Sequence, residues 1–149
     1  MITINEALNY LRIDAADQTT KDEVQGMLDA AKELVQRKTG YVWEETSKTY
    51  DASQDRSFII YDYPINTDLE ALENDYTSGP GYTRIENPLN ADTITLNVGY
   101  QLGGPPRALE QATLQLLKHY YYESETGAVS AALPPATQQI INQYRRFIV

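Results

Sequence analysis

The sequence predicts an α+β protein: a small helical bundle of about four helices, with a mostly antiparallel β-rich region inserted between the second and third helices. Apolar residues recur at helical spacing near both ends of the chain. Residues 41–101 are instead rich in β-branched and aromatic residues. The length of 149 residues suits one domain with a substantial core. We therefore expect a single domain over residues 1–149.

Two helices are predicted before the β-rich region, at residues 4–12 and 21–38. Each begins at a capping-box pattern, in which a threonine caps the helix and a glutamate three residues later reaches back to it. Basic residues near the end of the second helix complement its dipole, and Gly40 ends it. The two capping patterns are Thr3 with Glu6 and Thr20 with Glu23.

The region 41–101 is predicted to form a small antiparallel sheet. Four segments favour strands, and the last of them alternates between polar and apolar residues. Weaker strand candidates are Leu69–Tyr76 and Tyr82–Ile85, separated by the turn sequence Ser78-Gly79-Pro80-Gly81. A set of irregular loops is the alternative. The four segments are Val42-Trp43, Lys48 to Tyr50, Ser57 to Tyr61 and Thr93 to Val98.

A long helix at residues 106–125 is predicted to be the centre of the bundle. Pro106 suits the first helical position, and Gly127 can adopt the left-handed conformation just past the end. Two apolar stripes indicate a helix covered on more than one side. The stripes are Leu109, Ala112, Leu116 and Tyr120 on one face and Leu114, Leu117 and Tyr121 on a second. These tyrosines suit a core, or alternatively a subunit boundary.

A last helix is predicted at residues 135–147, after Pro134-Pro135, with Ile140, Ile141 and Tyr144 on its inner side. Two arginines and three apolar residues end the sequence. An apolar segment of this kind either folds back on the core or awaits a partner, and the sequence leaves both alternatives open.

Acidic residues outnumber basic ones by 21 to 12, for a net charge of −9. Residues 41–104 contain eleven acidic and three basic residues, a net charge of −8. This argues against a free-standing DNA-binding module, which needs a basic face; a solvated surface is the simplest explanation of the acid. The absence of cysteine excludes disulfides and thiolate sites. Neither a signal peptide nor a membrane span is expected.

We predict no catalytic, cofactor or metal site. The only histidine, His119, has no second cluster of ligands, and phosphate-binding glycine loops and nucleophile elbows are missing. Carboxylates gather in the acidic middle, but nothing in the sequence arranges two of them around a substrate. The residues alone therefore predict an acidic α+β domain that acts by binding.

The order of several short motifs resembles the head–tail connector (adaptor) family of tailed bacteriophages. The resemblance spans nearly the whole chain and depends on the ordered set rather than on one motif. The motifs are Leu11-Arg12-Ile13-Asp14, Leu28-Asp29-Ala30-Ala31, Thr39-Gly40-Tyr41, Tyr63-Pro64-Ile65, Ile94 to Tyr100, Pro105-Pro106, His119-Tyr120-Tyr121, Leu133-Pro134-Pro135 and Tyr144-Arg145.

The resemblance implies a structural role in the virion neck. Proteins of this family form a ring, usually of twelve subunits, beneath the portal, and the ring extends the DNA channel. Implied partners are the portal protein, further copies of the chain, a downstream connector, stopper or tail protein, and double-stranded DNA that passes without specific binding. The resemblance implies no cofactor and no membrane, and a protein made in the host cytoplasm.

Two sets of residues are candidates for this role. Carboxylates facing the channel lower DNA adhesion because they repel phosphates, and aromatic and arginine side chains are typical of binding hot spots. The channel candidates are Asp62, Asp68, Glu70, Glu73 and Asp75. The candidates for contact with the portal are Tyr144, Arg145, Arg146, Phe147 and Ile148.

Three alternatives remain at this stage. One is a different tail-completion or neck protein of similar size. Another is an acidic module that mimics DNA, which would space carboxylates like phosphates and bind a basic protein in a salt-sensitive manner. The third is a small acidic enzyme, which would need a pocket holding a perturbed carboxylate pair.

Overall fold

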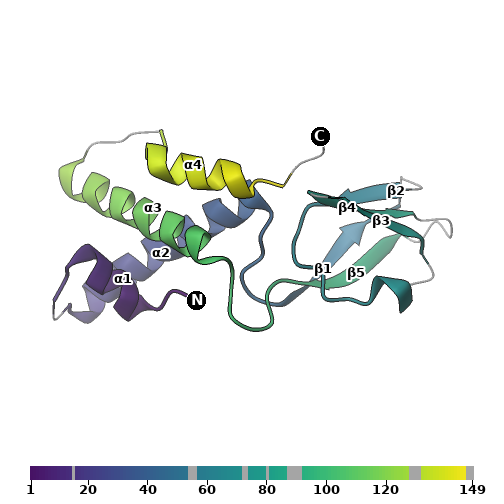
Figure 1. Ribbon diagram of the computed structural model, residues 1–149. Coiled ribbons are helices and arrows are strands. Elements are labelled where there is room, and N and C mark those ends of the chain that lie inside the picture. The colour runs from purple at the N-terminus through teal and green to yellow at the C-terminus, as the bar shows by residue number, and fades with distance from the viewer. Residues whose placement is uncertain are drawn as a thin grey trace. The chain divides into compact units, whose positions relative to one another are not determined.

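The computed structural model describes residues 1–14, 16–53, 57–71, 74–79, 81–86, 92–127 and 132–146. Its helices and antiparallel strands confirm the predicted α+β class, with the strands inserted between the second and third helices (Figure 1). The chain divides into two compact units. The helical unit contains Met1–Thr39 and Pro105–Tyr144, and the β unit contains Gly40–Gly104 and Arg145–Val149. That the two units act as a single connector domain stays a prediction.

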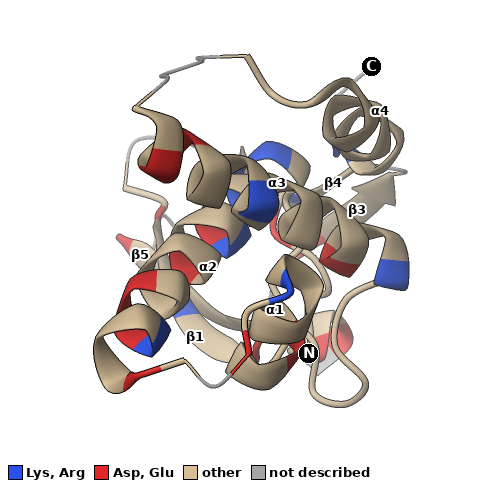
Figure 2. Cartoon of the chain, turned by 90° about the vertical axis from the view of Figure 1, so that its left-hand side faces the viewer, with Lys and Arg blue, Asp and Glu red and all other residues tan. Residues whose placement is uncertain are grey.

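The helical unit is built around the pair α2 and α3, each of which contacts the three other helices. Its helices are α1 (Ile4–Leu11), α2 (Gln18–Thr39), α3 (Arg107–Thr126) and α4 (Pro135–Tyr144). Figure 2 shows acidic and basic residues interspersed along these helices.

The first stripe predicted on the central helix is buried except for Tyr120, which is partly exposed, and the second stripe is shifted. Leu109, Ala112 and Leu116 are fully buried. On the second face the buried pair is Thr113 and Leu117, whereas Leu114 and Tyr121 are partly exposed. Thr113 is tolerated there because its hydroxyl donates a hydrogen bond to the Leu109 carbonyl at 2.9 Å.

Local sequence signals predicted the start of α1 correctly but not the start of α2. The capping box of α1 is confirmed: Glu6 N–H donates to Thr3 Oγ1 at 3.2 Å, and Thr3 N–H donates to Glu6 Oε2 at 2.7 Å. The predicted cap at Thr20 is wrong, because Thr20 N–H donates to Asp17 Oδ1 at 2.8 Å and α2 already begins at Gln18. Aspartate is among the strongest capping residues, and it stands one turn earlier.

The ends of the later helices also differ slightly from the prediction. Pro106 is the residue before α3 rather than its first helical residue. Gly127 ends α3 in the predicted left-handed conformation, at φ 67°. The last helix ends at Tyr144, where the sequence predicted helix to 147.

The β unit contains two small antiparallel sheets. β1 (Thr46–Asp51) pairs with β5 (Thr93–Val98), and β4 (Tyr82–Glu86) lies between β2 (Ser57–Ile60) and β3 (Tyr76–Gly79). The strict alternation of β5 is confirmed, since every second side chain is buried. Buried aliphatic side chains form the core of this unit: Val42, Ala52, Ile60, Ile85, Ile94, Leu96 and Val98.

Two strand predictions in this region are wrong. The segment predicted from Leu69 to Tyr76 includes a 3₁₀ turn, η1 (Leu69–Ala71), and β3 begins only at Tyr76. An aspartate starts the turn, with Asp68 Oδ1 accepting from the Glu70 N–H at 3.1 Å. Val42-Trp43 is not a strand, although both side chains are buried.

Candidate functional site

Three tyrosines from distant parts of the sequence meet in the β unit. Tyr41 follows α2, Tyr63 follows β2 and Tyr100 follows β5. Backbone hydrogen bonds bring their segments together: Tyr63 N–H donates to Gly40 O and Val42 N–H to Tyr63 O, both at 2.8 Å, and Tyr100 N–H donates to Val42 O at 3.2 Å. These main-chain bonds hold the backbones of the three tyrosines on neighbouring segments.

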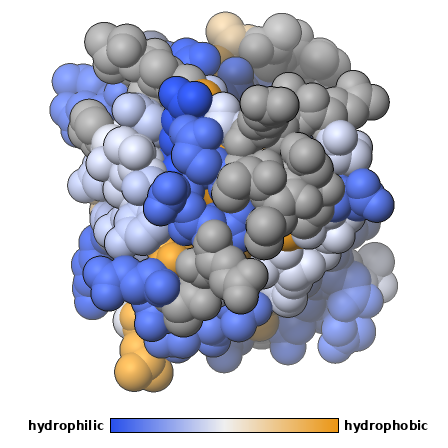
Figure 3. All heavy atoms as spheres, turned by 90° about the vertical axis from the view of Figure 1, so that its right-hand side faces the viewer, coloured by the Kyte–Doolittle hydropathy of each residue, from blue (hydrophilic) through white to orange (hydrophobic). Residues whose placement is uncertain are grey.

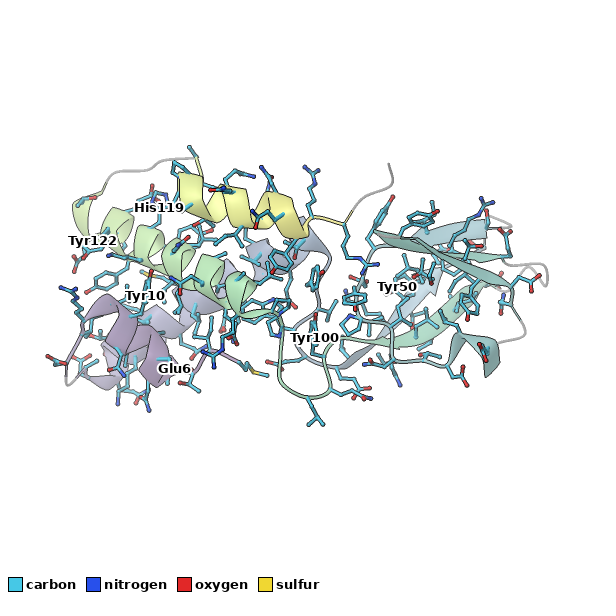
Figure 4. The ribbon with its side chains drawn as sticks, viewed as in Figure 1. Glu6, Tyr10, Tyr50, Tyr100, His119 and Tyr122 are labelled. Carbon is cyan, nitrogen blue, oxygen red and sulfur yellow. The ribbon has the colours of Figure 1, made fainter. Side chains whose placement is uncertain are left out.

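The three rings contact one another in favourable aromatic geometries. The centroids of Tyr41 and Tyr63 are 5.3 Å apart in an edge arrangement, and those of Tyr63 and Tyr100 are 6.4 Å apart in another. Tyr41 and Tyr100 are stacked at 6.5 Å. We call these three residues the tyrosine cluster. Figure 4 labels Tyr100 among them.

Arg146 from the C-terminal segment lies on this cluster. Its guanidinium carbon is 4.3 Å from the centroid of the Tyr63 ring, a cation–π contact. Gly40, beside Tyr41, has a φ of 80°, and a Cβ built there would lie only 2.5 Å from the Tyr61 carbonyl oxygen, so the close approach of the two backbones requires glycine. Within the β unit, the tyrosine cluster therefore binds the side chain of Arg146, which belongs to the C-terminal segment.

The environment of Arg146 is unusual for a cation. Its Nε is buried and has no hydrogen-bond partner among the residues that the structure describes. Burial lowers the pKa of the guanidinium, while the three tyrosines of the cluster act to raise it. An arginine stays charged in proteins, and this cation lies on the face of the Tyr63 ring.

The other predicted portal-contact residues are described in part. Tyr144 is the last residue of α4 and is partly exposed, and Arg145 is exposed. Phe147 and Ile148 lie outside the described residues. Arg146 contacts the β unit, whereas the apolar residues 147–149, for which the sequence left two alternatives open, lie outside the described residues.

The predicted channel carboxylates fall into two groups. Asp62 is partly buried, pairs with Lys48 Nζ at 3.1 Å and accepts from the Tyr50 hydroxyl at 2.7 Å. Asp68, Glu70 and Asp75 are exposed, and Glu73 lies outside the described residues. Figure 3 shows one face of the molecule, whose described residues are mainly hydrophilic. Asp62 thus has a structural role, and the exposed three are the better candidates for contact with solvent or DNA.

A groove of about 760 Å³ lies between α1 and α3 in the helical unit. Its carboxylates are already engaged: Glu6 caps α1, and Glu110 is 2.8 Å from the Met1 amino group. The hydrogen bonds from Thr3 lower the pKa of Glu6. A catalytic carboxylate pair needs one partner held protonated, and the lowered pKa of Glu6 favours its charged form instead.

His119 has a local partner on α3, Glu123, whose Oε1 is 3.1 Å from His119 Nε2 (Figure 4). Across the described part of the chain, no three acidic or histidine side chains are grouped as metal ligands. None of the helices described is both long and apolar enough to cross a membrane.

Sequence reasoning missed the tyrosine cluster as a site. Tyr41, Tyr63, Tyr100 and the arginine pair all occur in or beside the motifs that carried the resemblance, yet nothing in their spacing connects them. The only available signal was that each tyrosine stands at the end of a predicted element, next to glycine or proline.

Comparison with known proteins gives one family and a structural neighbour. A family model described as "Head completion protein" matches residues 1–147. A chain from a structure described as "Neck of empty GTA particle computed with C6 symmetry" superposes with a TM-score of 0.68. The two chains are 16% identical, and the match covers 99% of this chain and 91% of that one. No curated protein matches the sequence.

Proposed function

The chain belongs to the head completion protein family, and we propose that it is a structural protein of the virion neck that joins the DNA-filled head to the tail. The observation that carries this proposal is the family match over residues 1–147, nearly the whole chain. The match also confirms the resemblance to head–tail connector proteins stated from the sequence.

The proposed assembly is a ring beneath the portal, which extends the DNA channel and offers a surface to the next connector or tail protein. The neck to which the structural neighbour belongs was computed with C6 symmetry. A ring of twelve subunits, the number implied by the resemblance, contains sixfold symmetry. A closed ring requires two different contact faces on each subunit, and we propose that α2 and the β unit supply them.

Within this ring, the C-terminal segment is proposed to contact the portal. Arg145 is exposed, and Tyr144 is partly exposed at the end of α4. Arginine and tyrosine are enriched among the residues that dominate binding energy. The exposed carboxylates Asp68, Glu70 and Asp75 are proposed to face the channel or its rim, where negative charge discourages DNA from adhering.

The test is attachment to DNA-filled heads that lack this protein. The purified chain is added, and the portal vertex is imaged by cryo-electron microscopy. We expect a new ring of density below the portal, which also counts the subunits. Bare portals, with the chain located elsewhere in the particle, would favour another tail-completion role. Salt-sensitive binding to a basic nucleic-acid-binding protein would instead favour a DNA mimic.

A chain ending at Gln143 tests the contact itself, with Tyr122→Ala on α3 as a control that removes an exposed tyrosine elsewhere. We expect the shortened chain to keep its circular dichroism spectrum and to lose attachment, and the control to keep both. Unfolding of the shortened chain would make the segment part of the core.

A further inference from the structure

The proposed portal contact and the observed fold compete for one side chain. Arg146 is a candidate anchor on the portal, yet in the isolated chain its guanidinium lies on the Tyr63 ring at 4.3 Å. With its Nε buried, the docked guanidinium cannot present the edge formed by Nε and Nη to a partner. Binding a partner carboxylate through that edge requires the side chain to leave the cluster first.

The groups that contact Arg146 in the cluster are ones that a partner protein could replace. The cluster provides ring faces, and the buried Nε has no acceptor among the described residues. A carboxylate on a partner would offer what the cluster lacks, because arginine and carboxylate form two parallel charge-assisted hydrogen bonds. Leaving the cluster therefore removes a cation–π contact and allows the buried donor to be satisfied.

We infer that the tyrosine cluster is an internal docking site that holds the C-terminal segment on the β unit until an acidic partner surface binds Arg146. The inference deepens the proposed function and depends on it only for the identity of the partner. Docking in the free chain is a separate claim and can be measured without any partner.

Such a docking site lowers the apparent affinity for the partner. Only chains with Arg146 released are competent to bind, so the measured dissociation constant is raised by the reciprocal of the competent fraction. A partly desolvated cation–π contact corresponds to about a fivefold to thirtyfold change in that equilibrium.

Docking is tested first in the free chain by NMR. In the wild type, we expect the Arg146 Hε resonance to be shifted by ring currents and to show contacts to the Tyr63 ring. Tyr63→Leu, which keeps apolar bulk without a ring face, is expected to abolish both signals. Tyr63→Phe keeps the ring face and is expected to retain them. An Arg146 Hε signal identical to that of the exposed Arg145 in the wild type would overturn the inference.

Attachment to heads lacking this protein is then titrated for the same variants. We expect Tyr63→Leu to attach about fivefold to thirtyfold more tightly than the wild type, Tyr63→Phe to match the wild type and Arg146→Ala to attach more weakly. Should Tyr63→Leu lose its fold by circular dichroism, Tyr100→Leu takes its place. Equal or weaker attachment of a folded leucine variant contradicts the inference, whereas failure of every chain to attach, with docking seen by NMR, contradicts only the proposed function.

Discussion

At the scale of single residues, Asp62 shows how the fold decides what a carboxylate does. The sequence places it in a strongly acidic stretch, which suggested a surface facing DNA. In the structure it accepts hydrogen bonds from Tyr50 and Lys48 and is therefore occupied within the β unit. These partners stand 12 and 14 residues away, and no local pattern links them to Asp62.

Replacing Tyr50 tests this arrangement. Burial, followed by the hydrogen bond to Asp62, raises the pKa of the Tyr50 hydroxyl. Tyr50→Phe is expected to lower the free energy of unfolding at pH 7 by about 1 kcal/mol, a typical net contribution of one hydrogen bond, because the partly buried bond to Asp62 is lost. Denaturant unfolding provides this measurement.

The pH dependence gives a second readout. The folded chain keeps the Tyr50 proton above pH 10, where the unfolded chain releases it, so the wild type loses stability as the pH rises from about 10. Tyr50→Phe is expected to lose stability less steeply over this range. Tyr122→Phe, at an exposed site on α3, controls for the other tyrosines and should follow the wild type. Equal slopes for wild type and Tyr50→Phe would show that the folded-state pKa is not raised.

At the scale of elements, local signals predicted the existence of each helix better than its ends. The capping box of α1 involves residues three apart, so the sequence alone was sufficient. For α2 two caps compete within one turn, and Asp17 prevails over Thr20. The strands at 69–76 and 42–43 were wrongly predicted because a strand-like composition does not by itself create a ladder of hydrogen bonds. The first segment contains the 3₁₀ turn η1, and Val42 and Trp43 are buried outside the named strands.

Substitution of two glycines in the helical unit tests how backbone conformation affects stability, and we expect the two substitutions to have opposite effects. Gly127 has φ 67° and Gly26 is within α2, and neither would bring a Cβ within 4 Å of another atom. Gly127→Ala is expected to destabilise by about 1 kcal/mol, because alanine is strained in the left-handed region. Gly26→Ala is expected to stabilise by about 0.5–1 kcal/mol, because it favours the helix.

Thermal unfolding followed by circular dichroism measures both substitutions, and each serves as the control for the other. Changes of the same sign would show that crowding or altered solubility, rather than backbone conformation, determines the effect.

At the scale of the whole molecule, the sequence predicted the order of helices and strands but not the division into two units. Hydrophobic periodicity reports which face of an element is buried, and not which element covers it. The tyrosine cluster was not predicted for the same reason. Its residues meet only when segments 40–42, 63–66 and 98–100 are joined by long-range backbone hydrogen bonds. The C-terminal residues proposed to contact the portal were identified from their composition. The contact between Arg146 and the Tyr63 ring could not be predicted in this way.

If the two units are separately cooperative, core substitutions should act locally. Leu116 in α3 and Ile85 in β4 are both fully buried. We expect Leu116→Ala and Ile85→Ala each to cost about 2–5 kcal/mol and to speed amide hydrogen exchange only in the unit that carries the substitution. Hydrogen exchange with mass spectrometry resolves this peptide by peptide, and faster exchange in both units for either variant would show one cooperative domain.

The distribution of charge yields a prediction for the assembled neck. Reversal of Asp68, Glu70 and Asp75 to lysine changes the formal net charge from −9 to −3, since each reversal adds two. If these exposed residues face the channel, DNA ejection from reconstituted heads is expected to slow, and high salt should restore it because it screens contacts between lysine and phosphate.

The matched control reverses Glu44, Asp51 and Asp92, which are exposed in the same unit and produce the same change in charge. Slower ejection with the first set alone supports a channel position for Asp68, Glu70 and Asp75, whereas equal effects of the two sets, or no effect of either, place these carboxylates away from the DNA.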